Sequence, residues 1–124
     1  MLQQLRTFFA HAFQPKRNRL RLVVSHDGVA LFDEDREQWQ FRWESVTRIE
    51  TYKRDFGVVD MIYIAFTVES GRRKCSPCDQ THGFDLLCRR LSEQFPSIAE
   101  DWWFRVAFPA FETNFSVLYE KLPT

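Results

Sequence analysis

The chain has 124 residues, of which 44% are apolar and 27% are charged, as in an ordinary folded domain. Its 17 basic and 17 acidic side chains cancel, whereas a protein dedicated to nucleic acid normally carries a basic excess, so we expect no nucleic-acid partner. No apolar run approaches the roughly twenty residues of a membrane span, and the N-terminus lacks the pattern of a secretory signal.

The N-terminal stretch, residues 1–15, has apolar residues at three- and four-residue spacing and ends at Pro15, which predicts a short amphipathic helix. A basic cluster follows it. We interpret this cluster as solvated charge leading into a strand, with a binding patch for anions or anionic lipid as the alternative. Its members are Lys16, Arg17, Arg19 and Arg21.

Two apolar runs, 20–25 and 29–32, flank His26-Asp27-Gly28 and predict a β-hairpin. Asp-Gly is typical of a turn in which both central residues have positive φ, so we expect that geometry at Asp27 and Gly28.

Aromatic residues alternate with polar ones from Trp39 to Trp43 and predict a third strand. A short helical turn or bulge is expected at 43–46, before a fourth strand at 47–53.

The stretch 60–69 predicts the central strand, because its apolar residues alternate with a period of two. One face should form a wall of the core. A short basic strand at 72–76 should follow it at an edge of the sheet. The residues expected on the core face are Ile62, Ile64, Phe66 and Val68.

The clearest helix is predicted at 81–95, where one face is apolar and Pro96 ends the pattern. A second helix is expected at 98–108. For residues 111–122 the spacing of Phe115, Leu118 and Leu122 favours a third helix, although Phe115, Val117 and Tyr119 also fit a strand.

Aromatic residues are concentrated in the C-terminal part of the chain. Three are consecutive from Trp102 to Phe104, and adjacent helical positions diverge by about 100°, so at least one should be exposed or covered by another segment. Aromatic side chains dominate protein-binding hot spots. The candidate partner-binding residues are therefore Trp102, Trp103, Phe104, Phe108 and Phe111.

Three cysteines and a histidine form the one metal-like pattern, Cys75-Ser-Pro-Cys78 followed by His82 and Cys88. We prefer unliganded thiols to a zinc site or a redox pair, since the spacing differs from that of zinc knuckles and Cys88 falls on an apolar helix face. The odd number of cysteines fits a reducing, cytoplasmic setting. No metal or cofactor is expected.

Catalytic chemistry is not expected either. Neighbouring Ser25, His26 and Asp27 would point in different directions and could not form a relay. The four glycines match no phosphate-binding loop. Basic pairs such as Lys53/Arg54 should be solvated surface charge.

The order of a hairpin, an aromatic strand, the segment RWESVTRIETYKRD, a long strand, a Gly turn, a short strand and an amphipathic helix resembles the pleckstrin-homology-like (PH-like) superfold. Trp43 to Glu50 resembles a stretch of bacterial PH-like and GRAM-like domains. The resemblance covers residues 20–95. It implies an α+β fold, a partly open antiparallel β-barrel or sandwich of six to seven strands with a capping amphipathic helix.

We therefore expect a single domain over residues 1–124, made of an N-terminal helix (1–15), a β-rich core with its capping helix (20–95) and a C-terminal extension with extra helical segments (98–124). Its expected function is non-catalytic binding of a protein partner in a bacterial cytoplasm. Binding to anionic lipid or a membrane surface is the alternative, and toxin-neutralising immunity proteins are a further possible class.

Overall fold

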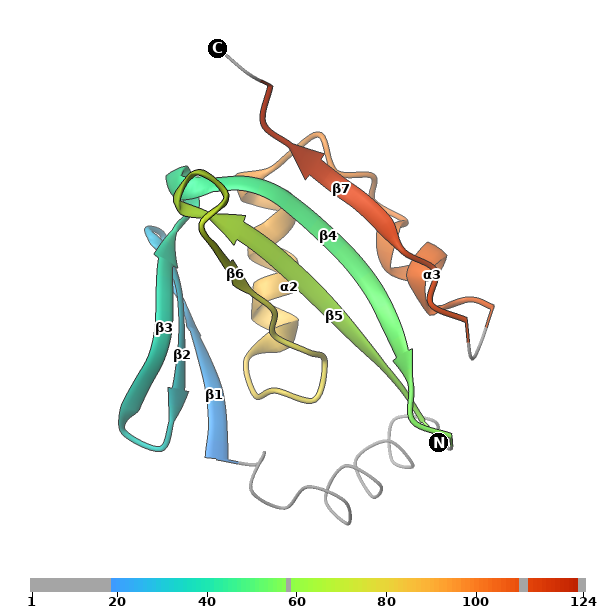
Figure 1. The fold of residues 1–124 in the computed structure, drawn as a ribbon, viewed down its shortest axis with the longest axis horizontal. Helices are drawn as coiled ribbons and strands as arrows, with labels where there is room; N and C mark the ends of the chain where they lie inside the picture. The colour runs from blue at the N-terminus through green and yellow to red at the C-terminus, as the bar shows by residue number, and fades with distance from the viewer. Residues whose placement is uncertain (1–18, 58, 110–111, 123–124) are drawn as a thin grey trace.

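The computed structural model describes residues 19–57, 59–109 and 112–122. The N-terminal helix expected at 1–15 lies outside these ranges. The described chain is α+β, with two antiparallel sheets and two α-helices (Figure 1). Among the described residues no strand of one sheet pairs with a strand of the other, so the two sheets do not close into a barrel.

The first sheet is an antiparallel meander of three strands. It consists of β1 (Leu20–Val24), β2 (Gly28–Asp33) and β3 (Arg36–Arg42), in that order. The predicted hairpin is present, and β3 leads into a short 3-10 helix, η2 (Trp43–Ser45), where the helical turn was expected. This turn carries the chain from the first sheet to the second.

The second sheet has four strands in the order β6-β5-β4-β7. Their bounds are β4 (Val46–Asp55), β5 (Asp60–Val68), β6 (Arg73–Cys75) and β7 (Ser116–Glu120), and a 3-10 helix, η3 (Glu69–Gly71), joins β5 to β6. The central strand predicted at 60–69 is β5, which pairs with β4 on one side and with β6 on the other.

Two helices accompany the sheets: α2 (Phe84–Gln94) and α3 (Trp102–Ala107). Helix α2 lies between the two sheets, behind the second one in the view of Figure 1. The predicted core face of β5 is confirmed, since Ile62, Ile64, Phe66 and Val68 are all buried. These side chains share one core cluster with Leu87 and Leu91 of α2, so burial of apolar surface fixes the helix against the sheet.

The turn of the first hairpin differs from the expected one. Asp27 and Gly28 both lie in the described part of the chain, and neither has a positive φ. Instead, Ser25 N–H donates to the Gly28 carbonyl (2.9 Å), and Ser25 Oγ accepts from the N–H groups of Asp27 and Gly28. Glycine is needed here for space, because a Cβ at residue 28 would lie 2.0 Å from the carbonyl oxygen of Phe41.

The C-terminal segment also differs from the expectation. Residues 116–120 form β7 and not a helix, because they pair antiparallel with the edge of β4. Backbone hydrogen bonds from Lys53 N to Thr113 O and from Lys121 N to Thr47 O extend this pairing at both ends. The second predicted helix, 98–108, is reduced to α3, which begins at Trp102.

Candidate functional site

The exposed aromatic side chains of the C-terminal segment are the strongest candidate site. In α3, Trp102 is buried and Trp103 is half-buried, with its ring 6.1 Å from that of Phe84. Phe104 is 67% exposed and Phe108 is 56% exposed. Their ring centroids are 4.9 Å apart, so the two rings form one apolar surface outside the core.

The helical spacing explains this division of the aromatic residues. Trp102 and Val106, four residues apart, are both buried and hold one face of α3 against the core. Phe104 lies on another face of α3, and Phe108, the residue that follows the helix, places its ring beside it. Three consecutive aromatic side chains cannot all face one core, and Phe104 is the one that projects outward. Phe111, the fifth sequence-predicted residue, lies outside the described residues.

Two further exposed apolar side chains, not among the predicted partner-binding residues, lie just before β7 and within it. Phe115 is 55% exposed and Val117 is 44% exposed. The alternation of Phe115, Val117 and Tyr119 indicated a strand with outward-facing apolar residues, but the spacing of Phe115, Leu118 and Leu122 favoured a helix. Val117 pairs with Glu50, whose side chain lies on the opposite face of β4 from Lys53, so Phe115 and Val117 are not part of the Phe104–Phe108 ring pair. We call Phe104 and Phe108 the aromatic surface.

Asn114 joins the segment before β7 to the C-terminal end of α3. Its Nδ2 donates to the carbonyl oxygens of Val106 (3.1 Å) and Pro109 (3.0 Å). Phe108 and Phe115 are the chain neighbours of Pro109 and Asn114, so their backbones flank the same junction. Figure 1 shows α3 and the start of β7 on the same side of the molecule.

Lys53 of β4 holds the C-terminal end of α3. Contrary to the expected surface position, its side chain is buried on the core face of β4. Its Nζ donates to the carbonyl oxygens of Ala107 and Pro109 and lies 3.2 Å from Asp60 Oδ2. The burial is possible because the carboxylate and the last carbonyl groups of the helix compensate the ammonium charge.

The described part of the basic cluster is occupied by local contacts. Arg19 lies 3.5 Å from Asp33 and 3.1 Å from Glu34, and Arg21 lies over the ring of Phe32. Lys16 and Arg17 lie outside the described residues. The structure therefore places two of the four basic residues beside carboxylates or an aromatic ring.

The cysteines and the histidine are not gathered into one site. Cys75 is buried in the core, Cys78 lies 3.8 Å from Thr81 Oγ, and His82 is exposed. Within the ranges that the structure describes, no three His, Cys, Asp or Glu side chains could hold a metal ion. Burial raises the pKa of the Cys75 thiol, and burial with a smaller effect of Asp85 raises the pKa of Cys88 to about 12.

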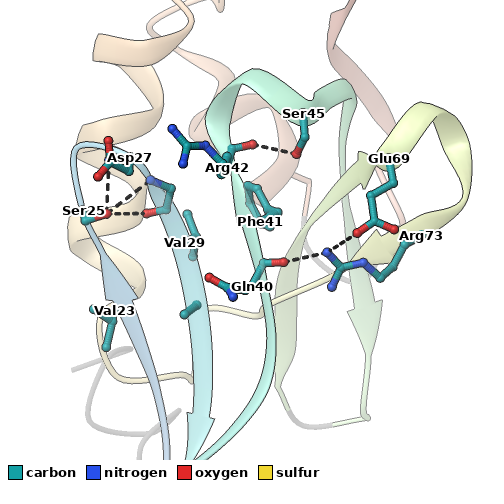
Figure 2. Close-up of a pocket in the computed structure, with 12 residues that line it drawn as sticks. Val23, Ser25, Asp27, Val29, Gln40, Phe41, Arg42, Ser45, Glu69 and Arg73 are labelled. Carbon is teal, nitrogen blue, oxygen red and sulfur yellow. Dashed lines mark hydrogen bonds and ion pairs between the residues drawn. The ribbon is translucent and has the colours of Figure 1, made fainter.

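A cavity of about 700 Å³ lies at the turn end of the first sheet, beside η3 and β6 (Figure 2). Arg73 donates to the carbonyl oxygen of Gln40 (2.6 Å) and to Glu69 (2.9 Å), which links β6 to the edge of β3. The hydroxyl groups of Ser25 and Ser45 donate to main-chain oxygens. These polar groups of the cavity wall therefore form hydrogen bonds within the protein, and those bonds connect the turn and the two sheets.

A second cavity, of about 520 Å³, lies near the C-terminal end of α2. Trp43, Phe95 and Tyr119 line it, and the ring of Phe95 contacts the rings of both Trp43 and Tyr119. The charged side chains around it have both signs, and Arg42 is paired with Glu44 (2.8 Å). Such a mixed rim does not select one class of ligand.

The comparisons assign no family. No protein-family model, protein of curated function or solved structure matches this chain. The functional argument therefore rests on the residues themselves. Among the residues described by the structure, no helix is both long and apolar enough to cross a membrane.

Proposed function

We propose that this chain is a non-catalytic protein-binding domain of a bacterial cytoplasm, and that the aromatic surface contacts its partner. One observation carries the proposal: the adjoining rings of Phe104 and Phe108 are more than half exposed, although the core contains many other aromatic side chains. Burial of exposed aromatic rings is a main source of affinity in protein–protein interfaces. A toxin-neutralising role would be one case of this function.

The PH-like architecture is part of the proposal. Two three-strand meanders, β1-β2-β3 and β4-β5-β6, precede α2, which is the order expected for a PH-like domain. Strand β7 is a departure from that order, because it follows the helices and extends the second sheet beside β4. Phe104 and Phe108 also follow α2, so the proposed surface lies on the part of the chain that the resemblance does not cover.

The test is capture of a partner by the intact chain, immobilised and exposed to an extract of its source cells. We expect a specific protein to be retained by the original chain and to be lost with Phe104→Ala and with Phe108→Ala. Val23→Ala is the matched control, since Val23 is an exposed apolar residue of the other sheet. Equal retention by all four proteins would exclude the aromatic surface as the binding site.

A vesicle assay separates this function from lipid binding. One outcome would be that the chain binds anionic vesicles at low salt and leaves them at high salt, with no effect of Phe104→Ala on this binding. That result would favour a lipid ligand bound by the basic cluster. We expect no such binding, because Arg19 is already beside two carboxylates.

A further inference from the structure

The edges of a sheet are places where another chain can add by backbone pairing, and native proteins normally block them. The described strands provide four edges, at β1, β3, β6 and β7. At β1, the N–H of Leu22 donates to the carbonyl oxygen of His82 (2.8 Å). Arg21 forms an isolated bridge with the same residue, so the loop before α2 covers part of this edge.

The edges of β3 and β6 are blocked by side chains and by length. Two carbonyl groups of β3, those of Gln40 and Arg42, point away from β2. They accept hydrogen bonds from Arg73 of β6 (2.6 Å) and from Ser45 Oγ (2.7 Å), respectively. Strand β6 has only three residues, and very short edge strands resist pairing.

Strand β7 provides the fourth edge, on the outer side of the second sheet (Figure 1). Its inner side pairs with β4, since Lys121 N–H donates to the carbonyl oxygen of Thr47 (2.8 Å). Tyr119 and Ser116 lie opposite the two β4 residues that follow Thr47 at steps of two. Because backbone direction alternates along a strand, the backbone groups of Tyr119 and Ser116 also point inward.

The outward backbone groups of β7 belong to Val117 and Glu120. In the part of the chain that the structure describes, no donor or acceptor forms a hydrogen bond with these groups. The side chains along the edge are accessible, since Val117 is 44% exposed and the flanking Phe115 and Leu122 are 55% and 81% exposed. An open, apolar edge of this kind is a site for strand addition.

We propose that β7 pairs antiparallel with β7 of a second copy of this chain, about a two-fold axis, so that the second sheets of the two copies join. A two-fold axis brings the same surface of both copies together, and two open antiparallel edges supply each other's missing donors and acceptors. This edge is separate from the aromatic surface, so the dimer does not depend on the proposed function.

The outward groups determine the register of this pairing. Val117 and Glu120 lie opposite Glu50 and Arg48 of β4, so they share one face of the sheet. Between them, Leu118 is an extra residue where the register against β4 shifts. When Val117 of one copy lies opposite Glu120 of the other, the two bulges face each other and pairing continues on both sides. Residues 115–122 then pair with residues 122–115.

The side chains match in this register. Phe115 of each chain lies opposite Leu122 of the other, so the two most exposed apolar residues of the segment cover each other. Neither Glu120 nor Lys121 lies opposite a charged residue, whereas alignment of Glu120 with its own copy would oppose two carboxylates. A second copy is therefore favoured over an unrelated strand, because its apolar and charged residues already fit this edge.

Sedimentation velocity of the full-length chain tests the dimer over about a hundredfold range of concentration. We expect a monomer at the lowest concentration and a rising fraction of dimer above it. Leu122→Asp should raise the dissociation constant of the dimer about tenfold, because it removes the apolar cover of Phe115. Leu122 is 81% exposed, so the fold of the monomer should not change. Phe104→Ala is the matched control and should leave the dimer unchanged.

Disulfide cross-linking tests the register. Val117→Cys and Glu120→Cys are prepared as separate variants and oxidised alone or as a mixture. We expect a cross-linked dimer from the mixture, because the two positions lie opposite each other at a distance that a disulfide can span. Neither variant alone should cross-link at this position, since each residue lies opposite a different one. Non-reducing electrophoresis and peptide mass mapping identify the bond.

The outcomes decide between the second copy and other occupants. A monomer at every concentration would overturn the proposal, as would a dimer that Phe104→Ala dissociates and Leu122→Asp does not. Cross-linking of either single variant to itself would show a different register and contradict the pairing. If the chain stays monomeric but loses a captured cellular protein with Leu122→Asp, the edge binds a strand of another protein and the proposal is wrong. None of these results changes the test of the aromatic surface.

Discussion

The ammonium group of Lys53 lies 2.8 Å from the main-chain oxygen of Ala107 and joins strand β4 to the last turn of α3. Carbonyl groups at the end of a helix have no donors within the helix, and a cation placed there satisfies them and favours the helix dipole. Phe108 follows directly after Ala107. The position of the aromatic surface thus depends on a buried contact made by a residue 54 positions earlier in the chain.

Replacement of Lys53 by methionine should lower the free energy of unfolding by about 3 kcal/mol, because the variant keeps the apolar stem but removes the ammonium group from a buried ion pair. Urea denaturation measures the change. Arg54→Met is the matched control, since Arg54 is exposed on the next position of β4, and it should cost less than about 0.5 kcal/mol. Similar losses for both variants would contradict the role of Lys53.

Gly28→Ala should destabilise the protein by about 3 kcal/mol through a steric clash. The added Cβ would lie 2.0 Å from the carbonyl oxygen of Phe41, and backbone cannot move aside as a flexible side chain can. Gly57→Ala provides the comparison. Its φ is +87°, but no heavy atom lies near the added Cβ, so only backbone strain of about 1 kcal/mol is expected. If thermal unfolding showed the larger loss for Gly57→Ala, the assignment of Gly28 to a close approach would be wrong.

Phe66→Ala should cost about 4 kcal/mol of stability, since the ring is completely buried between Phe41 and Trp43 and its removal leaves a cavity. Phe104→Ala should change stability by no more than about 0.5 kcal/mol, because that ring is outside the core. Chemical denaturation of both variants tests the division between core and surface rings. A large loss for Phe104→Ala would show that its ring is needed for folding.

Cys88 should be nearly inert toward iodoacetamide at pH 8. Burial, with a smaller effect of Asp85, raises the pKa of its thiol to about 12, so very little reactive thiolate exists in the folded protein. Peptide mass mapping follows the labelling, and labelling in urea should proceed at the rate of a free thiol. Fast labelling of Cys88 under native conditions would contradict the raised pKa of this partly buried thiol.

The same pKa shift has a consequence for stability at alkaline pH. An unfolded cysteine has a pKa of about 8.5, so between that pH and about 12 the unfolded chain loses the proton while the folded chain keeps it. The free energy of unfolding should therefore fall as pH rises through this window. In Cys88→Ala the fall should be shallower, and an unchanged pH dependence would count against the shift.

Much of the fold could be predicted from local patterns. The alternation in β5, the aromatic alternation in β3 and the amphipathic face of α2 each identify an element, because side chains on the same face recur with a period of two in a strand and about 3.6 in a helix. The helical turn at Trp43–Ser45 was predicted for the same kind of reason. The exposure of one aromatic residue among Trp102, Trp103 and Phe104 also followed from helix geometry alone.

The errors concern contacts between distant residues. The apolar spacing of residues 111–122 fits a helix and a strand about equally well. Residues 116–120 form a strand because the edge of β4 supplies backbone hydrogen bonds to them. Lys53 was assigned to the surface because an isolated lysine in a sequence has no visible partner. Asp27-Gly28 indicated a hairpin correctly, but Ser25 determined the geometry of its turn.

The sequence by itself determined where strands and α2 occur, which face of β5 joins the main core cluster and that the chain is an α+β protein, since these properties depend on spacings of a few residues. Only the tertiary structure decided that β7 lies beside β4, that Lys53 holds α3 and that the rings of Phe104 and Phe108 adjoin outside the core. The first two of these relationships depend on hydrogen bonds and charge compensation between residues about 50 or more positions apart, which no local period encodes.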